Sequence, residues 1–582
     1  MGRATSFRSR CAGLAICLWQ TIAAPAHAQV VERHLPPPPA PTAPTLATPL
    51  PPVAAGDDRA LGAVLHAIVL LGPSEAVQSG PANGVVVSSA LPRMDRESAQ
   101  RTIRAFLGEP ITRRLISRIE AAIVNASRRQ GFPFVEVSTP EQEISGGVLQ
   151  IRVVEFRLGK LNLAGASPRE AARIAGAVRL VPGGEIDSRR LSQDLDWLGR
   201  TPFRTIAPAF TPGAELGQTD LDLAVTHLRP WRVEAGYSNS GASPTDQDRY
   251  FVGATAGGVV IADSVLSLQI TGSPDFWVTG DEVLVQSHPT YESVAGRFTA
   301  PLTPRSDIEL SLDAVETNQA VPFFVVREQT LETSLAWRTA VSNFVPLPGD
   351  VRLGIEAKAQ RRMTFFGPVD VLEGGVNIYQ ILGGWSESWN DRFGHSTLDL
   401  AIHVAPGGVD RLNSDANFSD FTSGRVGGAG YAYLDIDYGR LTTLPRGLSL
   451  ATQLTAQYAG RPIPDSEQLG LGGQGLVRGY FLDVGAFDDA VILRDELHAP
   501  ALAVVKSAAA PVAVAPFAFL DLGWGRNEAA GQNVRLASVG LGADLQVTRR
   551  IAADLSLSYP LARVRETHVG DWRLEARLAV SY

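Results

Sequence analysis

The clearest candidate for chemistry is one arginine in a glycine-rich stretch near the last fifth of the chain. The stretch LGLGGQGLVRGYF runs from Leu469 to Phe481 and surrounds Arg478 with five glycines. A phosphate-binding loop would need a lysine followed by serine or threonine, and then a helix. This stretch has neither, so the sequence does not favour a nucleotide site. What this arginine binds must therefore be inferred from the segments around it.

Other enzymatic arrangements are also missing from the sequence. The nine histidines form no H-E-x-x-H motif and no paired metal-ligand spacing, and no serine lies in a G-x-S-x-G motif. The two cysteines, Cys11 and Cys17, both fall in the first 28 residues. We therefore expect a protein that is not an enzyme, with no catalytic residues, no metal and no cofactor.

The first 28 residues have the three parts of a secretory signal peptide. Three arginines precede the short apolar run CAGLAICLWQTIAAP, and an A-x-A cleavage pattern ends at Ala28. The apolar run is too short for an uncleaved membrane anchor. We predict cleavage after Ala28, which leaves a mature chain without cysteine and excludes disulfides and thiol catalysis.

The charge and hydropathy of the remaining chain restrict its partners. Residues 29–582 carry 49 basic and 60 acidic side chains, a net charge of −11. An acidic exported protein is a poor candidate for binding nucleic acid, which needs a basic surface. After the signal peptide no run of 18 or more apolar residues remains. If this protein crosses a membrane, it must do so as a closed β-barrel.

Residues 29–228 are predicted to form a linker and two small domains. Residues 29–60 are proline-rich and favour an extended polyproline II conformation. Residues 61–155 and 156–228 each show the order β-α-α-β-β. Ser167 followed by Pro168, and Asp187, are typical of helix N-termini. The repeat predicts two α+β domains in tandem.

Residues 229–582 show no convincing helix, and their strands alternate apolar and polar residues instead. A soluble β-sandwich also alternates. Here, however, the apolar faces end in aromatic residues, as expected at bilayer edges, and the opposite faces stay polar strand after strand. We therefore predict a transmembrane antiparallel β-barrel. Its 354 residues fit about 16 strands, although 14 or 18 would also fit.

The last strand gives the strongest support for a barrel. In WRLEARLAVSY one face is apolar and ends in aromatic residues, and the other carries Arg573, Glu575 and Arg577. Placing the two arginines toward lipid would cost about 2–4 kcal/mol each near the bilayer midplane. An apolar strand that ends in an aromatic residue also resembles the insertion signal of bacterial outer-membrane barrels. That signal would consist of Trp572, Leu578, Val580 and Tyr582.

The arginine stretch lies in a segment of some thirty residues between two of these strands, which is typical of an extracellular-side loop. Val477-Arg478-Gly479-Tyr480 resembles the VRGY motif of barrel transporters that handle unfolded polypeptide. Within that group the chain resembles the two-partner secretion transporters, the hemolysin secretion/activation (ShlB/FhaC/HecB, TpsB) family with POTRA domains. The resemblance covers residues 61–582. Its further matches are Gln130-Gly131-Phe132, Pro140-Glu141-Gln142, Gly147-Val148-Leu149, Tyr237-Ser238-Asn239-Ser240-Gly241, Asp489, Arg494-Asp495-Glu496-Leu497 and Phe519-Leu520-Asp521-Leu522-Gly523.

The resemblance implies roles for the matched residues. Arg478 would lie at the tip of a loop folded into the barrel lumen, with Asp521 on the barrel wall as its partner. An exposed loop arginine is the alternative. The supporting motif would be Phe519, Gly523, Arg494 and Glu496. Many family members have an N-terminal helix that plugs the pore, and the proline-rich segment here departs from that pattern.

The implied function is secretion of a large partner exoprotein, such as a β-helical hemolysin or adhesin, without ATP. The expected location is the bacterial outer membrane, with the N-terminal domains in the periplasm. Expected partners are the unfolded exoprotein, outer-membrane lipid and, during biogenesis, the barrel-assembly machinery. Two alternatives remain: an insertase of the same superfamily, which commonly has more tandem domains, and a passive porin, which needs no periplasmic arm.

Overall fold

The computed structural model describes residues 57–278, 288–505, 512–548, 550–565 and 567–582. The predicted signal peptide and residues 29–56 of the predicted linker lie outside the described residues. Contacts divide the chain near residue 230 into two units, an α+β unit and a barrel unit, which are described separately. In the described ranges no helix is both long and apolar enough to cross a bilayer.

The first sheet of the α+β unit has the strand order β2-β1-β4-β3. Two helices pack against it, and the apolar residues between them form one buried cluster around Ile68 and Ile119. The elements are β1 (Ala67–Leu71), β2 (Gly84–Val87), α2 (Glu97–Arg104), α3 (Arg113–Arg129), β3 (Val135–Ser138) and β4 (Val148–Glu155). The expected order lacked β2, a four-residue strand whose parallel pairing with β1 is not visible in a local pattern.

The second sheet has the order β5-β7-β6 and a separate buried cluster that includes Leu195 and Leu221. The elements are β5 (Arg157–Ala164), α4 (Pro168–Ala177), α5 (Ser188–Gly199), β6 (Arg204–Pro212) and β7 (Gln218–His227). The helix starts follow from their capping residues. The Ser167 side chain accepts a hydrogen bond from the Glu170 amide, and Asp187 accepts from the amides of Arg189 and Arg190.

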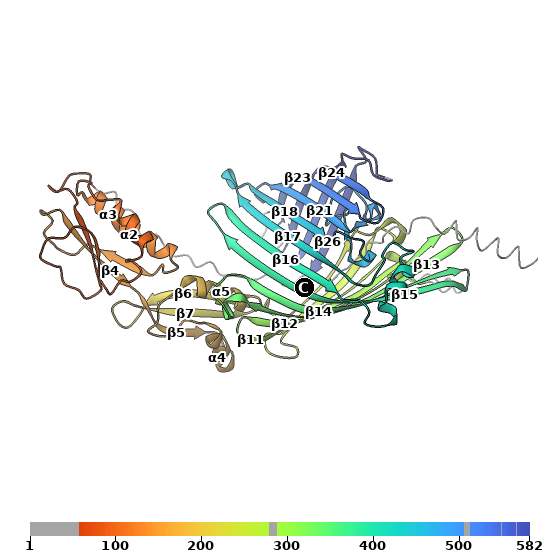
Figure 1. Ribbon diagram of the computed structural model, residues 1–582, viewed down its shortest axis with the longest axis horizontal. Helices are drawn as coiled ribbons and strands as arrows, with labels where there is room; N and C mark the ends of the chain where they lie inside the picture. The colour runs from red at the N-terminus through yellow and green to blue at the C-terminus, as the bar shows by residue number, and fades with distance from the viewer. Residues whose placement is uncertain (1–56, 279–287, 506–511, 549, 566) are drawn as a thin grey trace, which may run out of the picture. The chain divides into compact units, whose positions relative to one another are not determined.

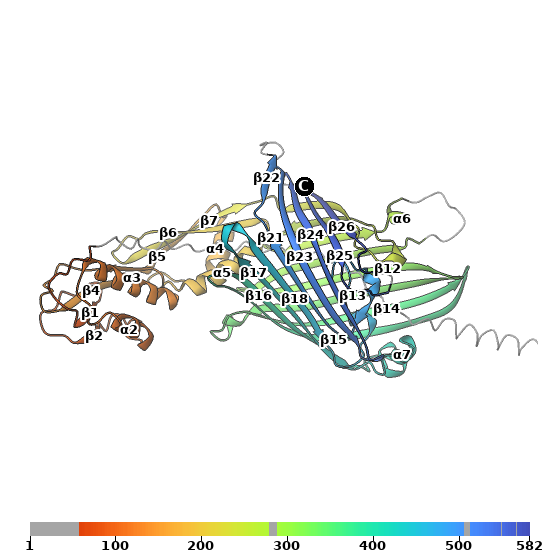
Figure 2. The same cartoon turned by 90° about the horizontal axis from the view of Figure 1, so that it is seen from above.

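The barrel unit is a closed antiparallel barrel (Figures 1 and 2). Among the described residues sixteen strands form its wall, and the short strand β22 (Leu502–Val505) continues β21 along β23. The wall strands are β8 (Trp231–Ser238), β9 (Arg249–Gly257), β10 (Val265–Gly272), β11 (Tyr291–Thr303), β12 (Ser306–Val321), β13 (Phe324–Ala340), β14 (Asp350–Phe366), β15 (Val369–Asn390), β16 (Gly394–Ala405), β17 (Tyr431–Thr443), β18 (Ser449–Tyr458), β21 (Asp489–His498), β23 (Val512–Asn527), β24 (Gln532–Val547), β25 (Ile551–Pro560) and β26 (Arg573–Ser581).

The ring closes between β26 and β8, whose register runs from Arg577 opposite Ser238 to Ser581 opposite Glu234. The Asn239 side chain extends this seam, because its Nδ2 donates to the Leu574 carbonyl and its Oδ1 accepts from the Ala576 amide. Because β8 and β26 pair with each other, neither strand has an unpaired backbone edge that faces lipid. The closed ring is a barrel and not the β-sandwich that the alternation alone also allowed.

The wall separates apolar from polar side chains as the alternation predicts. In β25, Leu555 and Leu557 are exposed on the outer face, whereas Ser556 and Ser558 are buried on the lumen side. In β26, Leu574 is exposed and Glu575 is 1% exposed. Aromatic residues meet at both ends of the last strand, with ring centroids 4.9 Å apart for Tyr559 and Trp572 and 6.0 Å for Trp231 and Tyr582.

Two long loops on the same side of the barrel fold inward. The helical loop (residues 406–430) contains α7 (Asp415–Phe421), which corrects the expectation that this region has no helix. The arginine loop (residues 459–488) contains β19 (Leu469–Gly470) and β20 (Ala486–Phe487). A second short helix, α6 (Pro274–Trp277), follows β10. Helices of four and seven residues are too short to show a helical period in the sequence.

Candidate functional site

Arg478 lies at the tip of the arginine loop and is 3% exposed. Its Nε and Nη2 donate to the two carboxylate oxygens of Asp521 on β23, at 2.7 and 2.6 Å, and its own amide donates to the same side chain at 3.1 Å. Its Nη1 donates to Glu496 on β21 at 2.7 Å. This two-pronged geometry suits a guanidinium and would not suit a lysine. The burial of Arg478 rules out the exposed loop arginine.

Glycines let the loop tip approach the wall. Gly479 has a φ of +83°, and a Cβ there would lie 3.0 Å from the Cβ of Ser558 on β25. On the wall, a Cβ at Gly523 would lie 2.8 Å from the Val477 side chain, which is fully buried. The positive φ and both close approaches require residues without a side chain. The glycines therefore allow the arginine to reach its partner.

Aromatic residues of the two motifs hold the same tip. The Arg478 guanidinium carbon lies 3.6 Å from the ring centroid of Phe519, a cation–π contact. The Tyr480 hydroxyl lies 2.8 and 2.9 Å from the carbonyl oxygens of Ala537 and Ala562 and accepts a hydrogen bond from the Ala562 amide. Tyr480 therefore ties the loop to β24 and to the loop after β25.

Three arginines and three carboxylates form the network around the tip. Arg494 contacts Glu496 at 3.3 Å and donates to the Gly475 carbonyl of the loop at 3.0 Å. Glu575 accepts from the Gly479 amide at 3.1 Å and lies near Arg573. The six charges balance, with Arg478, Arg494 and Arg573 opposite Asp521, Glu496 and Glu575. A balanced network lets the site stay charged in a partly buried position.

The structure thus brings Arg478, Asp521, Glu496, Arg494 and Phe519 together, with Gly523 beneath Val477. The proposed insertion-signal residues are not part of this cluster. They lie on the outer face of β26 or at its ends, and all of them are exposed, namely Trp572, Leu578, Val580 and Tyr582. Their role in insertion stays a prediction.

The sequence reasoning missed three residues of this region. Glu575 was placed on the lumen face, but without a partner. Lys358 of β14 and Glu467 of the arginine loop, which form an ion pair at 2.5 Å, were not singled out. A signal existed for one of them, because Lys358 is one of three lysines in a chain whose other basic residues are arginine or histidine.

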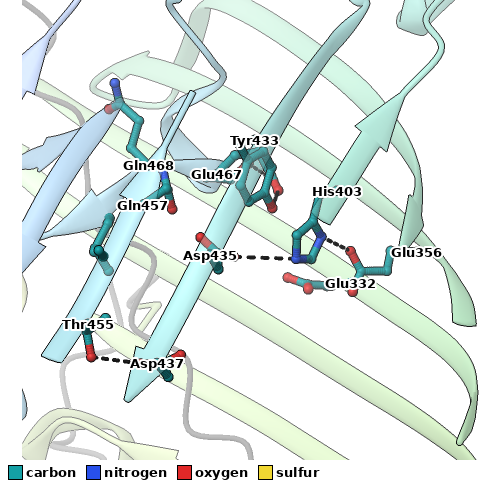
Figure 3. Close-up of a pocket in the computed structure, with 13 residues that line it drawn as sticks. Glu332, Glu356, His403, Tyr433, Asp435, Asp437, Thr455, Gln457, Glu467 and Gln468 are labelled. Carbon is teal, nitrogen blue, oxygen red and sulfur yellow. Dashed lines mark hydrogen bonds and ion pairs between the residues drawn. The ribbon is translucent and has the colours of Figure 1, made fainter. Parts of the chain in front are cut away.

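A second polar cluster lines the wall formed by β13 to β18. It surrounds a cavity of about 250 Å³ (Figure 3). His403 lies between Glu356 at 3.0 Å and Asp435 at 3.4 Å, and its ring stacks on Tyr433. Glu332, Asp437 and Glu467 also face the cavity. This wall is therefore rich in carboxylates, although in the described ranges no group of three or more such side chains is arranged to hold a metal ion.

Two family models match the chain. The haemolysin secretion/activation protein ShlB/FhaC/HecB model matches residues 385–545, a range that includes the arginine loop, β21 and β23. The ShlB-type POTRA domain model matches residues 81–155, which belong to the first sheet of the α+β unit. The two matches thus fall on the candidate site and on the N-terminal domains.

Curated relatives are outer membrane transporters. The chain is 23% identical over 409 residues to the outer membrane transporter CdiB of Dickeya dadantii, and 66% of each chain is covered. It is 26% identical over 159 residues to the outer membrane transporter CdiB-2 of Burkholderia pseudomallei, with 27% of each chain covered. The matched regions therefore span about a quarter to two thirds of these relatives.

Solved structures share the fold. CdiB from Escherichia coli superposes with a TM-score of 0.66 at 16% identity, covering 93% of this chain and 94% of that one. CdiB from Acinetobacter baumannii gives a TM-score of 0.57 at 16% identity and covers 98% and 97%. The chain is an outer-membrane β-barrel with periplasmic POTRA domains, and its residues 385–545 are similar to the haemolysin secretion/activation (ShlB/FhaC/HecB) family.

Proposed function

We propose that this protein secretes a large partner polypeptide across the outer membrane without ATP, as a two-partner secretion transporter. The observation that carries the proposal is a closed barrel whose polar lumen is occupied by a loop held through Arg478 and Asp521. A lumen occupied by a loop that is held through side-chain contacts suits a gated conduit. The curated relatives, which are outer membrane transporters, support the same function.

The N-terminal domains would receive the unfolded partner. In the described part of the α+β unit β2, β3, β5 and β6 are the edge strands, and the start of β5 is already bonded to residues 183–185 through Leu158. An extended peptide adds to such an edge through backbone hydrogen bonds, which need no fixed sequence. Of these strands, β6 contains Pro208, which lacks an amide donor. We therefore place the first contact with the partner at an edge other than β6.

Arg478 would act as the latch of the conduit. Its side chain fixes the loop tip to β21 and β23, and the resting pore is then closed at this position. Passage of the partner would require the latch to release. Folding of the partner outside the cell would prevent its return and thus supply direction without a nucleotide.

The C-terminal strand would direct the protein to the barrel-assembly machinery. Leu578, Val580 and Tyr582 form an exposed apolar row that ends in an aromatic residue at the chain terminus. The outer apolar face contacts outer-membrane lipid once the barrel is inserted. A charge placed in this row is expected to reduce insertion.

The experiment that tests the function compares three forms of the full chain in cells that export the partner. Arg478→Ala should lower export while the barrel remains heat-modifiable on gels, and deletion of residues 61–228 should abolish export from an inserted barrel. Arg563→Ala, which removes an exposed arginine on the same side of the barrel, is the matched control and should export normally. Export that persists in the deletion would overturn the proposed role of the N-terminal domains. Export that persists in cells without this protein would exclude the proposed function and leave a passive porin or an insertase.

A further inference from the structure

The arginine loop is anchored on two different parts of the wall. At the tip, Arg478 binds β21 and β23. Eleven residues earlier, Glu467 is buried against β13 to β17 and accepts from Lys358 Nζ at 2.5 Å, from Gln380 Nε2 at 2.8 Å and from the Tyr433 hydroxyl at 2.9 Å. Ser466 also donates to it, at 2.7 Å. Glu467 therefore has a complete set of partners that does not depend on the tip.

The burial of this pair makes it a firm attachment. The side chains of Lys358 and Glu467 are 6% and 3% exposed, and Glu332 lies 3.3 Å from the same ammonium group. Removing Lys358 would leave Glu467 buried without its counter-ion, which is strongly unfavourable. The loop is thus held at Glu467 even when the tip has no contact with the wall.

Further contacts join the segment of the arginine loop around Glu467 to the helical loop. Arg425 donates to the Ile463 carbonyl at 2.7 Å and pairs with Asp465. Ile463 is fully buried in an apolar cluster with Phe418 of α7 and Val376 of β15. We name residues 406–430 and 459–468 together the collar, because side chains and backbone of both segments pack as one body against β14 to β17.

The second part of the loop, residues 469–487, has a different character. We name it the lobe. It contains six glycines, of which Gly473 and Gly485 have φ values of +125° and +114°. The β19–β20 pair, Leu469 opposite Phe487, closes its base next to Asp488. Asp488 is fully buried and accepts from the Ile463 amide and the Gln468 side chain, so both ends of the lobe meet the collar.

The lobe covers one part of the lumen wall. Gly479 contacts Ser558, and Glu575 beneath it accepts from the Gly479 amide and from Ser556 and Ser558. On the far side, the Ser243 amide of the loop after β8 donates to Asp483. The lobe therefore contacts the wall from β21 to β26 and also the loop between β8 and β9.

We propose that the loop opens as two bodies: the lobe swings away about residues 468 and 488, and the collar stays in the lumen. The path for an unfolded segment of the exported polypeptide then runs along the wall that the lobe vacates, from β21 to β26. This inference rests on the proposed function for its substrate. The vacated wall suits unfolded segments of varied sequence, because it offers charges of both signs with one carboxylate in excess, the hydroxyls of Ser556 and Ser558, and apolar side chains such as Ile492.

Thiol labelling of the full chain tests this motion without any partner. Ser558→Cys lies under the lobe and Val376→Cys under the collar, and both positions are at most 1% exposed. Cys11 and Cys17 precede the expected cleavage site and are replaced by serine. The probe is a small cationic methanethiosulfonate, applied to protein in lipid vesicles, with each cysteine placed in the wild-type and the Arg478→Ala background.

Release of the latch should raise the labelling rate at position 558 roughly tenfold or more, since protection reports the population of the open form. The rate at position 376 should stay unchanged in Arg478→Ala and rise only when Glu467→Ala is added. Labelling at 376 in Arg478→Ala alone, or none there in the double variant, would overturn the division into lobe and collar. If Arg478→Ala fails to assemble, Asp521→Asn releases the same latch.

Ion conductance then tests the position of the path. In the Arg478→Ala background, reaction of the cysteine at 558 should lower the potassium conductance of single pores, because the open cross-section of a pore sets its conductance. Glu373→Gln, which removes an exposed carboxylate at a hairpin end, is the matched control for Glu467→Ala. An unchanged conductance after reaction at 558 would place the path elsewhere. Neither assay involves export, so failure of the proposed function would appear separately, as export that persists in cells without this protein.

Discussion

The two units of the chain use the same residue types in opposite ways. In the α+β unit apolar side chains such as Ile119 and Leu195 fill a closed interior, and polar residues lie outside. In the barrel unit Leu555 and Leu557 are exposed on the outer face, and Ser558 and Glu575 face inward. An ion pair is therefore surrounded by packed protein in one unit and borders a wet lumen in the other. The free energy that a contact contributes therefore depends on its surroundings as well as on its burial.

Ion pairs should show the largest difference between the units. In the second domain Glu170 is 8% exposed and contacts Arg204 at 3.2 Å and His227 at 2.9 Å. Glu170→Ala leaves Arg204 buried without this carboxylate and should destabilise the domain by about 4 kcal/mol. The measurement is the urea midpoint for proteolytic cleavage within residues 57–228 of the full chain.

The matched change in the barrel is Asp307→Ala, which removes the partner of Arg338 on the lumen face. Because the Arg338 side chain is 30% exposed, water can replace the lost carboxylate. The barrel should lose only about 1 kcal/mol. Equal losses in the two variants would contradict the distinction between a packed interior and a wet lumen.

Truncation of leucine should give the next largest difference. Leu195→Ala removes a side chain that is 1% exposed in the second domain and should cost about 3 kcal/mol, since a cavity remains. Leu557→Ala on the outer face should cost about 1.5 kcal/mol, the transfer term without a cavity, because lipid fills the space. Urea midpoints of the domain and of the barrel, followed in the same samples, provide the comparison.

The loss of stability of the second domain at acidic pH should depend on Glu170. Burial by itself would raise the pKa of Glu170, but hydrogen bonds and charges from Arg204 and His227 hold it below its ordinary value. A carboxyl whose pKa is lowered by folding stabilises the fold fully above its ordinary pKa, and this stabilisation is lost as the pH falls through the lowered value.

The measurement is the urea midpoint of the domain between neutral pH and pH 3. The wild type should lose stability over this range, and Glu170→Gln should flatten part of the slope. Asp187→Ala, which removes a helix cap in the same domain, serves as the control and should lower the whole curve instead. A slope that is the same in the wild type and Glu170→Gln would refute the assignment.

The smallest expected effect concerns a helix N-cap, a feature that the strands of the barrel wall do not have. Thr112 caps α3 by accepting from the Leu115 amide at 3.0 Å. Thr112→Ala should lower the stability of the first domain by about 1 kcal/mol. Thr112→Ser keeps the hydroxyl and should restore most of the loss, so a deficit shared by both variants would indicate a packing effect of the methyl group.

The sequence predicts best where a pattern is local. Ser167, Pro168 and Asp187 mark helix starts that the structure confirms, and the alternation of residues in β25 and β26 assigns each side chain to the correct face. The sixteen-strand ring lies within the range that chain length allowed, but length could not select it. Strand number depends on how every hairpin pairs, and no single hairpin carries that information.

Local sequence patterns could not predict the contacts between segments that are distant in the chain. The alternation places Glu575 in the lumen, yet only the fold reveals that the Gly479 amide, 96 residues away, donates to it. The pairing of Arg478 with Asp521 was expected from resemblance to a family, and no periodicity predicts it. Glu467 and Lys358, 109 residues apart, had neither a motif nor a period. Such pairs depend on where a loop folds, which is a property of the whole barrel.

The seam between β26 and β8 has a consequence for how the protein is made. The strand that completes the ring, β26, ends at Ser581, and its partner β8 begins more than 300 residues earlier, at Trp231. Contacts between such distant residues form slowly and late. The cylinder therefore cannot be sealed until β26 has been made and exported, and a chain that lacks this strand would present two unpaired edges to the periplasm.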